Sequence, residues 1–258
     1  MIVGEALGLL GVGVAAGVVS TVVSLASIVS YPALLAFGLS PLTANVTNTV
    51  ALVFTGVGAA AGSRPELAGA GRRVLALGPV AALGGATGAL LLLVTPSRTF
   101  ELIAPWLIAM ASLLLVRPPS GRSFGAHGDH GAHGEQGEHG VLGRASLFAV
   151  TIYVGYFGAA GGILVFAVLA AMLGQSAARV NAMKNVMTGL ANAVAALGFA
   201  LFGPVDWGAA APLAAGFLLG GWIGPKIARR LPGHSLRYLA AACGLAVAVK
   251  LGWESYAG

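Results

Sequence analysis

Long apolar segments alternate with short polar ones along nearly the whole chain. They are residues 2–23, 28–38, 41–62, 74–95, 99–116, 146–157, 161–173, 180–202, 209–228 and 236–252. A helix rises 1.5 Å per residue and needs about 20 residues to cross a bilayer, so several segments are long enough to span. Three segments, 28–38, 146–157 and 161–173, are too short. Short apolar segments beside glycine, serine or proline are typical of discontinuous or re-entrant helices.

The chain contains an internal repeat. Asn45 is matched by Asn181, 136 residues later, and the same offset relates glycines 84–85 to glycines 220–221. Such a constant offset indicates two related halves. We therefore predict a first membrane repeat, a linker and a second membrane repeat, at residues 1–117, 118–144 and 145–258.

Basic residues are distributed in opposite ways in the two halves. Loop 63–73 carries three arginines, whereas its counterpart, 203–208, carries only Asp206. Loop 226–237 is strongly basic, whereas its counterpart, 96–98, carries one arginine. Basic loops face the cytoplasm, so the two halves must have opposite orientations. The expected fold is an all-α polytopic membrane protein with two inverted repeats, about eight to ten membrane segments, and a cytoplasmic linker.

The composition supports a membrane protein. Hydrophobic residues make up 57% of the 258 residues and charged residues only 9%, against about 25% in soluble domains. The 40 glycines favour closely packed helices. A single cysteine excludes a disulfide framework and a multi-cysteine metal site. The basic loops account for the net charge of +6, so we expect a lipid bilayer and no nucleic acid as partner.

Polar residues interrupt the apolar segment 180–202. On a helix beginning near Ser176, spacings of three and four residues place one polar set on a single face: Asn181, Lys184, Asn185, Thr188 and Asn192. The first half has a matching face with Asn45, Asn48 and Thr49. We expect the two faces to meet near mid-membrane at the pseudo-twofold axis, where repeat-built transporters hold substrate.

The chemistry of this polar face suits an anion. Lys184 offers a positive charge, and asparagine amides and threonine hydroxyls add neutral donors. A charged residue in a span costs at least ~2.5–3.5 kcal/mol on insertion scales and usually marks a pathway. Two alternatives remain open. Lys184 could instead snorkel or bond to backbone carbonyls, and asparagine and threonine also join helices to one another.

Each half also has a break in its apolar pattern. In the second half the sequence GYFGAAGGIL contains Gly158, Gly161 and Gly162, and in the first half the break contains Ser24 and Ser27. A helix that restarts in mid-membrane presents free N–H groups and the positive end of its dipole to an anion. Close helix packing is the alternative reason for the glycines. We include all five residues in the predicted substrate site.

Three stretches of the second half carry a resemblance to a known family. They are GYFGAAGGIL, NAMKNVMTGLANAVAALGFALFGPVDWGAA and LAAGFLLGGWIGPKIARRLPGHSLR. Together they resemble the C-terminal half of the sulfite exporter TauE/SafE family, also called the TSUP family. In the first half, Gly17, Ser20 and Pro32 fall where the family pattern expects them. Residues 24–27, Ser-Leu-Ala-Ser, stand where members usually show Gly-x-Gly-Gly.

The resemblance implies a secondary transporter of the bacterial inner membrane, and an exporter of small sulfur-containing anions such as sulfite or organosulfonates. A carrier of small carboxylates is an alternative. The sequence contains no Ser/His/Asp set, Walker loop or buried carboxylate pair, so we expect neither an enzyme nor a cofactor. The particular anion, the coupling ion and the oligomeric state stay open, a homodimer included.

The linker is rich in glycine and histidine. Its candidate metal ligands are His127, His130, His133 and His139, because imidazole suits Ni²⁺, Co²⁺, Cu²⁺ and Zn²⁺. They leave a divalent metal (Ni/Co) transporter as an alternative function. A solvated, disordered linker is the simpler interpretation. A cation path that contains Lys184 would also repel its cargo.

Overall fold

The computed structural model describes residues 3–23, 26–116, 138–159 and 161–228, together with Val249 and Trp253. Within these ranges the chain forms ten helices: α1 (Val3–Val23), α2 (Ala26–Ala36), α3 (Pro41–Gly62), α4 (Arg64–Leu67), α5 (Gly71–Val94), α6 (Ser97–Val116), α7 (Glu138–Tyr156), α8 (Gly161–Leu173), α9 (Ala177–Phe202) and α10 (Trp207–Ala228). Five of them, α1, α3, α5, α9 and α10, are long and apolar enough to cross a membrane. The all-α polytopic membrane fold is confirmed.

Helix boundaries follow the apolar segments closely, with one difference. Helices α2 and α8 have only 11 and 13 residues, as their short apolar segments indicate. Helix α7 begins at Glu138, inside the predicted linker. Its first seven residues, EHGVLGR, contain only two apolar side chains, so the apolar pattern does not mark this part of the helix. Most of that linker and the segment 236–252 lie outside the described residues, apart from Val249.

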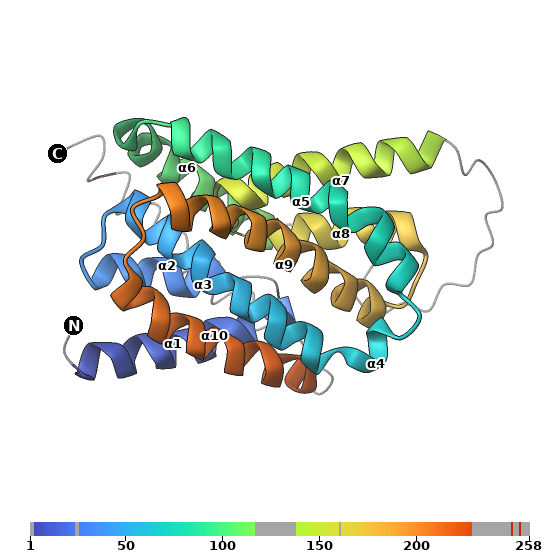
Figure 1. The fold of residues 1–258 in the computed structure, drawn as a ribbon, viewed down its shortest axis with the longest axis horizontal. Helices are drawn as coiled ribbons and strands as arrows, with labels where there is room; N and C mark the ends of the chain where they lie inside the picture. Colours follow the sequence, from blue (N-terminus) through green and yellow to red (C-terminus); the bar gives the residue numbers. More distant parts are fainter. Residues whose placement is uncertain are drawn as a thin grey trace.

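The order α1, α2, α3, α5 recurs as α7, α8, α9, α10. The first four begin at residues 3, 26, 41 and 71, and the second four at 138, 161, 177 and 207. An offset of 135 or 136 residues therefore relates the two sets. In Figure 1, α1 and α3 run from left to right, whereas α7 and α9 run from right to left. Matched helices point in opposite directions, as expected for an inverted repeat.

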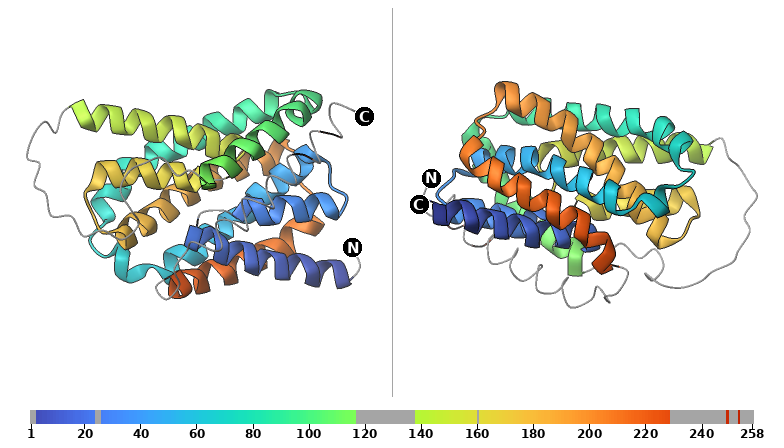
Figure 2. Two further views of the ribbon diagram at one scale, coloured as in Figure 1. Left: turned by 180° about the vertical axis from the view of Figure 1, so that it is seen from behind. Right: turned by 60° about the horizontal axis from the view of Figure 1, so that its bottom comes forward.

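The two halves pack mainly against each other. Helix α1 lies beside α10, α7 lies beside α5 on the opposite side of the bundle, and α3 and α9 cross between them (Figures 1 and 2). Glycines allow these close approaches. A Cβ at Gly220 of α10 would overlap the Val14 carbonyl oxygen of α1, and one at Gly56 of α3 would lie 2.9 Å from the Gly189 Cα of α9.

The exposed charged residues of the described part of the chain lie at the two ends of the bundle. Helix α4, the starts of α5, α7 and α9, and the end of α10 lie toward the end on the right of Figure 1. Six exposed cations lie on these elements: Arg64, Arg72, Arg73, Arg144, Arg179 and Lys226. We call this the basic end. The opposite end carries Asp206 and a pair formed by the exposed Arg98 and the half-buried Glu101, whose charged atoms lie 3.6 Å apart.

Candidate functional site

The two helix breaks come together beside the α3–α9 crossing. Helix α2 begins at Ala26, shortly after the end of α1, and α8 begins at Gly161, shortly after the end of α7. Between α7 and α8, Gly158 adopts a φ of 75°, which a residue with a side chain rarely adopts. Its N–H donates to the Tyr153 carbonyl at 3.1 Å, and the Gly161 N–H donates to the Gly158 carbonyl at 3.2 Å. The start of α8 is therefore fixed against α7.

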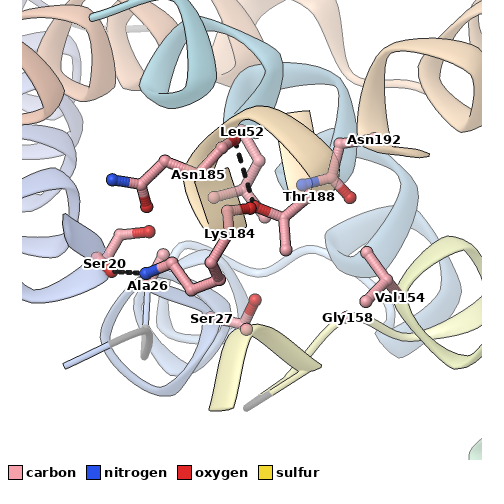
Figure 3. Close-up of a pocket in the computed structure, with 11 residues that line it drawn as sticks. Ser20, Ala26, Ser27, Leu52, Val154, Gly158, Lys184, Asn185, Thr188 and Asn192 are labelled. Carbon is pink, nitrogen blue, oxygen red and sulfur yellow. Dashed lines mark hydrogen bonds between the residues drawn. The ribbon is translucent and has the colours of Figure 1, made fainter. Parts of the chain in front are cut away.

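A small cavity lies where these breaks meet α3 and α9. Its volume is about 40 Å³, which is room for a few waters or one small ion. Figure 3 shows its lining, drawn from both halves: Ser20, Ala26, Ser27, Leu52, Val154, Gly158, Gly162, Lys184, Asn185, Thr188 and Asn192. Four of these residues come from α9, on the face that the helical spacing predicts.

Lys184 is the charged member of the described lining. Its side chain is only 1% exposed, and its Nζ lies 3.5 Å from the Ser20 carbonyl oxygen of α1 (Figure 3). The ammonium group therefore does not snorkel to the end of the bundle. A positive charge held inside a membrane protein usually marks a substrate or ion pathway.

Two asparagine side chains in the cavity wall have incomplete hydrogen bonding. The Asn185 Nδ2 and the Asn192 Oδ1 are buried without a hydrogen-bond partner among the described residues. Thr188, between them on α9, donates its hydroxyl to the Lys184 carbonyl at 2.9 Å. Buried polar atoms without a protein partner are available to bind a small polar ligand.

Behind the cavity, α2 and α3 share a chain of buried polar groups. Ser30 and Ser27 belong to α2, and Asn48 of α3 lies between them. The Ser30 Oγ lies 2.6 Å from the Asn48 Oδ1, and the Asn48 Nδ2 donates to the Ser27 Oγ at 3.2 Å. Of the three, Ser27 lines the cavity. Asn48 thus lies one layer behind the wall.

The structure brings only part of the predicted substrate site to the cavity. Five of the eleven predicted residues line it: Ser27, Gly158, Gly162, Lys184 and Asn185. Ser24 lies outside the described residues. Gly161 packs against the α7 side chain of Val154, and Thr49 donates its hydroxyl to the Asn45 carbonyl at 2.9 Å.

Asn45 and Asn181 are placed away from the lining, in matching contacts. The Asn45 Nδ2 donates to the Tyr156 carbonyl at 3.0 Å, and the Asn181 Nδ2 donates to the Thr21 carbonyl at 3.1 Å. Both acceptors lie in the last turn of a helix, α7 or α1, where carbonyls have no partner within the helix. Each asparagine thus caps a helix of the other half.

Sequence reasoning missed four lining residues, Ser20, Ala26, Leu52 and Val154. Ser20 is a polar residue in the apolar α1, which is a usable signal. Leu52 is apolar, but the 136-residue offset matches it to Thr188 of the polar face. Val154 could not be identified from the sequence, because nothing distinguishes it from the other apolar residues of its helix.

Acidic and histidine ligands do not cluster in the described part of the chain: no group of three or more His, Cys, Asp or Glu residues could hold a metal ion there. His127, His130 and His133 lie outside the described residues, as does the side chain of His139, although its backbone belongs to α7. The metal-transporter alternative therefore gains no support from the described residues.

Comparison with known proteins gives one match. A family model described as "Sulfite exporter TauE/SafE" matches residues 9–251. No curated protein and no solved structure matches the chain.

Proposed function

Because the chain belongs to the sulfite exporter TauE/SafE family, we propose that it is a secondary transporter that exports a small sulfur-containing anion such as sulfite or a small organosulfonate. The anion is held near mid-membrane in the cavity between the two halves. The chain acts as a carrier and not as an enzyme, and it needs no cofactor.

The observation that carries this proposal is the buried Lys184 beside neutral donors. A unit charge 4 Å from its counter-ion gains ~4 kcal/mol at an effective dielectric of 20. The net gain is smaller, because both ions lose water. Ser27 and Asn185, which line the same cavity, add directed hydrogen bonds. A cation in this cavity would be repelled, which disfavours the metal alternative.

Two helix starts add to the positive potential. The cavity lining includes Ala26 and Ser27 at the start of α2 and Gly162 at the start of α8. The first N–H groups of a helix have no partner within it, and the helix dipole places partial positive charge there. Together with Lys184, both starts favour an anion over a neutral or cationic substrate.

The basic end sets the orientation that we propose. Cytoplasmic loops of membrane proteins carry an excess of arginine and lysine. The basic end therefore faces the cytoplasm in a bacterial inner membrane, and the linker that leads into α7 lies on that side. In a Cys243→Ala background, an impermeant maleimide added to intact cells should label Asp206→Cys and not Arg72→Cys. The reverse pattern would contradict this orientation.

The function is tested in proteoliposomes with radiolabelled sulfite, methanesulfonate, acetate and Ni²⁺. We expect sulfite or methanesulfonate to cross faster than in liposomes that contain Lys184→Met. Faster movement of acetate alone would identify a carboxylate carrier. Faster movement of Ni²⁺ alone would identify a metal transporter and refute the proposal.

A further inference from the structure

We propose that Asn48 is a positioning residue that fixes the Ser27 hydroxyl as a hydrogen-bond donor to the substrate, and that the site is built for an oxyanion with a single net charge, such as hydrogensulfite or an organosulfonate. The inference rests on the proposed anion transport and specifies its substrate class. It follows from the polarity of the Ser30–Asn48–Ser27 chain and from the position of Asn48 in the repeat.

The hydrogen-bond distances favour one polarity of the chain. Two orientations of the Asn48 amide are self-consistent, and they differ in which serine faces the amide nitrogen. An O–H···O bond is typically about 2.7–2.8 Å long, whereas an N–H···O bond is about 2.9–3.0 Å and extends to 3.2 Å. The 2.6 Å contact with Ser30 therefore fits an O–H···O bond, and the 3.2 Å contact with Ser27 fits an N–H···O bond. The other acceptor near the Ser30 Oγ, the Ala26 carbonyl oxygen, is farther away, at 3.0 Å.

This polarity leaves the Ser27 proton available. The Ser27 oxygen accepts from Asn48, so its own O–H is free to donate elsewhere. All three residues are buried, at 0% exposure for Ser30, 1% for Asn48 and 6% for Ser27, so bulk water does not compete for these bonds. Figure 3 shows the Ser27 hydroxyl pointing toward the Lys184 side chain. Ser27 and Lys184 line the same cavity, so the Ser27 hydroxyl is placed to donate to an anion held there.

The internal repeat relates the Asn48 position to the charge that the site can accept. Asn48 occupies the position that the 136-residue offset matches to Lys184. A lysine there would add a second cation to the site, but the chain has an amide that orients a neutral hydroxyl instead. Within the described lining, Lys184 is the one ionisable residue. A second negative charge on the substrate would be buried without a counter-ion, which is costly.

The test uses purified protein and two probes of similar shape, methanesulfonate with one negative charge and sulfate with two. We expect the wild type to bind methanesulfonate at least about tenfold more tightly than sulfate by calorimetry. Asn48→Lys should raise the affinity for sulfate relative to methanesulfonate by about tenfold or more. Equal or tighter binding of sulfate by the wild type would overturn the single-charge inference, and anion binding as such would survive.

A double-mutant cycle tests the positioning role. Asn48→Ala should weaken methanesulfonate binding about tenfold on its own and hardly at all in the presence of Ser27→Ala, because it acts through Ser27. Fully additive effects would overturn the positioning role. Asn45→Ala is the matched control, on the same helix but away from the lining, and should keep the wild-type affinity. If the folded wild type binds neither probe, the proposed function fails first and this inference falls with it.

Discussion

The two halves of the molecule use equivalent positions in two different ways. Asn45 and Asn181 are equivalent and identical, and each caps a carbonyl in the other half. Those carbonyls, of Tyr156 and Thr21, are themselves 135 residues apart, which matches the offset between α1 and α7. The contacts that hold the halves together therefore keep the symmetry of the repeat.

The cavity breaks that symmetry. Lys184 is matched by Asn48, Thr188 by Leu52, and Gly162 of the second break by Ser27 of the first. A lining that differs between the halves can hold an asymmetric ligand in one preferred orientation. Positions that differ between the repeats are thus better candidates for substrate contact than positions that are the same.

Glycines at the helix crossings should show the largest effects. A Cβ at Gly85 would overlap the Ala191 carbonyl oxygen, and one at the equivalent Gly221 would lie 2.7 Å from the Thr55 carbonyl oxygen. Gly85→Leu and Gly221→Leu should each cost about 3 kcal/mol or more of stability, seen as loss of monodisperse protein. Gly4→Leu, with open space around it, is the control. Tolerance of either crossing substitution would contradict the symmetric scaffold.

Removal of the cavity charge should come next. Lys184→Met keeps the length of the side chain but removes its charge, so it should weaken binding of sulfite and methanesulfonate by tenfold or more, about 1.4 kcal/mol. Lys184→Arg should be milder but not neutral, because the planar guanidinium fills space differently. Titration calorimetry measures both, with the exposed Arg179→Met as the matched control. Equal affinities for Lys184→Met and wild type would assign Lys184 to helix packing.

The paired asparagines should affect stability and not binding. Asn45→Ala or Asn181→Ala leaves a carbonyl at the end of a helix without its partner, at a cost of about 1–3 kcal/mol. The two losses should be similar, because the contacts are equivalent. Thermal unfolding in detergent measures the losses, and calorimetry should show unchanged anion affinity. A tenfold loss of affinity would restore both residues to the substrate site.

Deletion of residues 121–136 should have the smallest effect. The deletion leaves α7, which begins at Glu138, intact. Anion transport should stay within about twofold of the wild type, because the sequence predicts that this segment is a linker and belongs to neither membrane repeat. Transport of radiolabelled sulfite measures this. Abolished anion transport, or tight Ni²⁺ binding that the deletion removes, would favour the metal alternative.

Much of the fold could be predicted from the sequence. The lengths of the apolar segments indicate the helices, and the constant offset between matching residues indicates the repeat. The start of α7 could not be predicted, because the helix begins before its apolar segment and the residues there show no continuous apolar pattern. Helical periodicity placed Lys184 and Asn185 on the face that lines the cavity. It also placed Asn45 and Asn181 on that face, but their acceptors are backbone carbonyls, which every residue carries and no sequence pattern marks.

The packing of each half against the other has a consequence for biosynthesis. When the ribosome has delivered α1, α3 and α5 to the bilayer, their main packing partners α10, α9 and α7 do not yet exist. The carbonyl that Asn45 caps belongs to a residue 111 positions later, which takes roughly 6–20 s to reach at 5–20 residues per second. During that interval the Asn45 amide lacks the carbonyl that it caps in the folded protein. Neither half made alone would assemble the cavity.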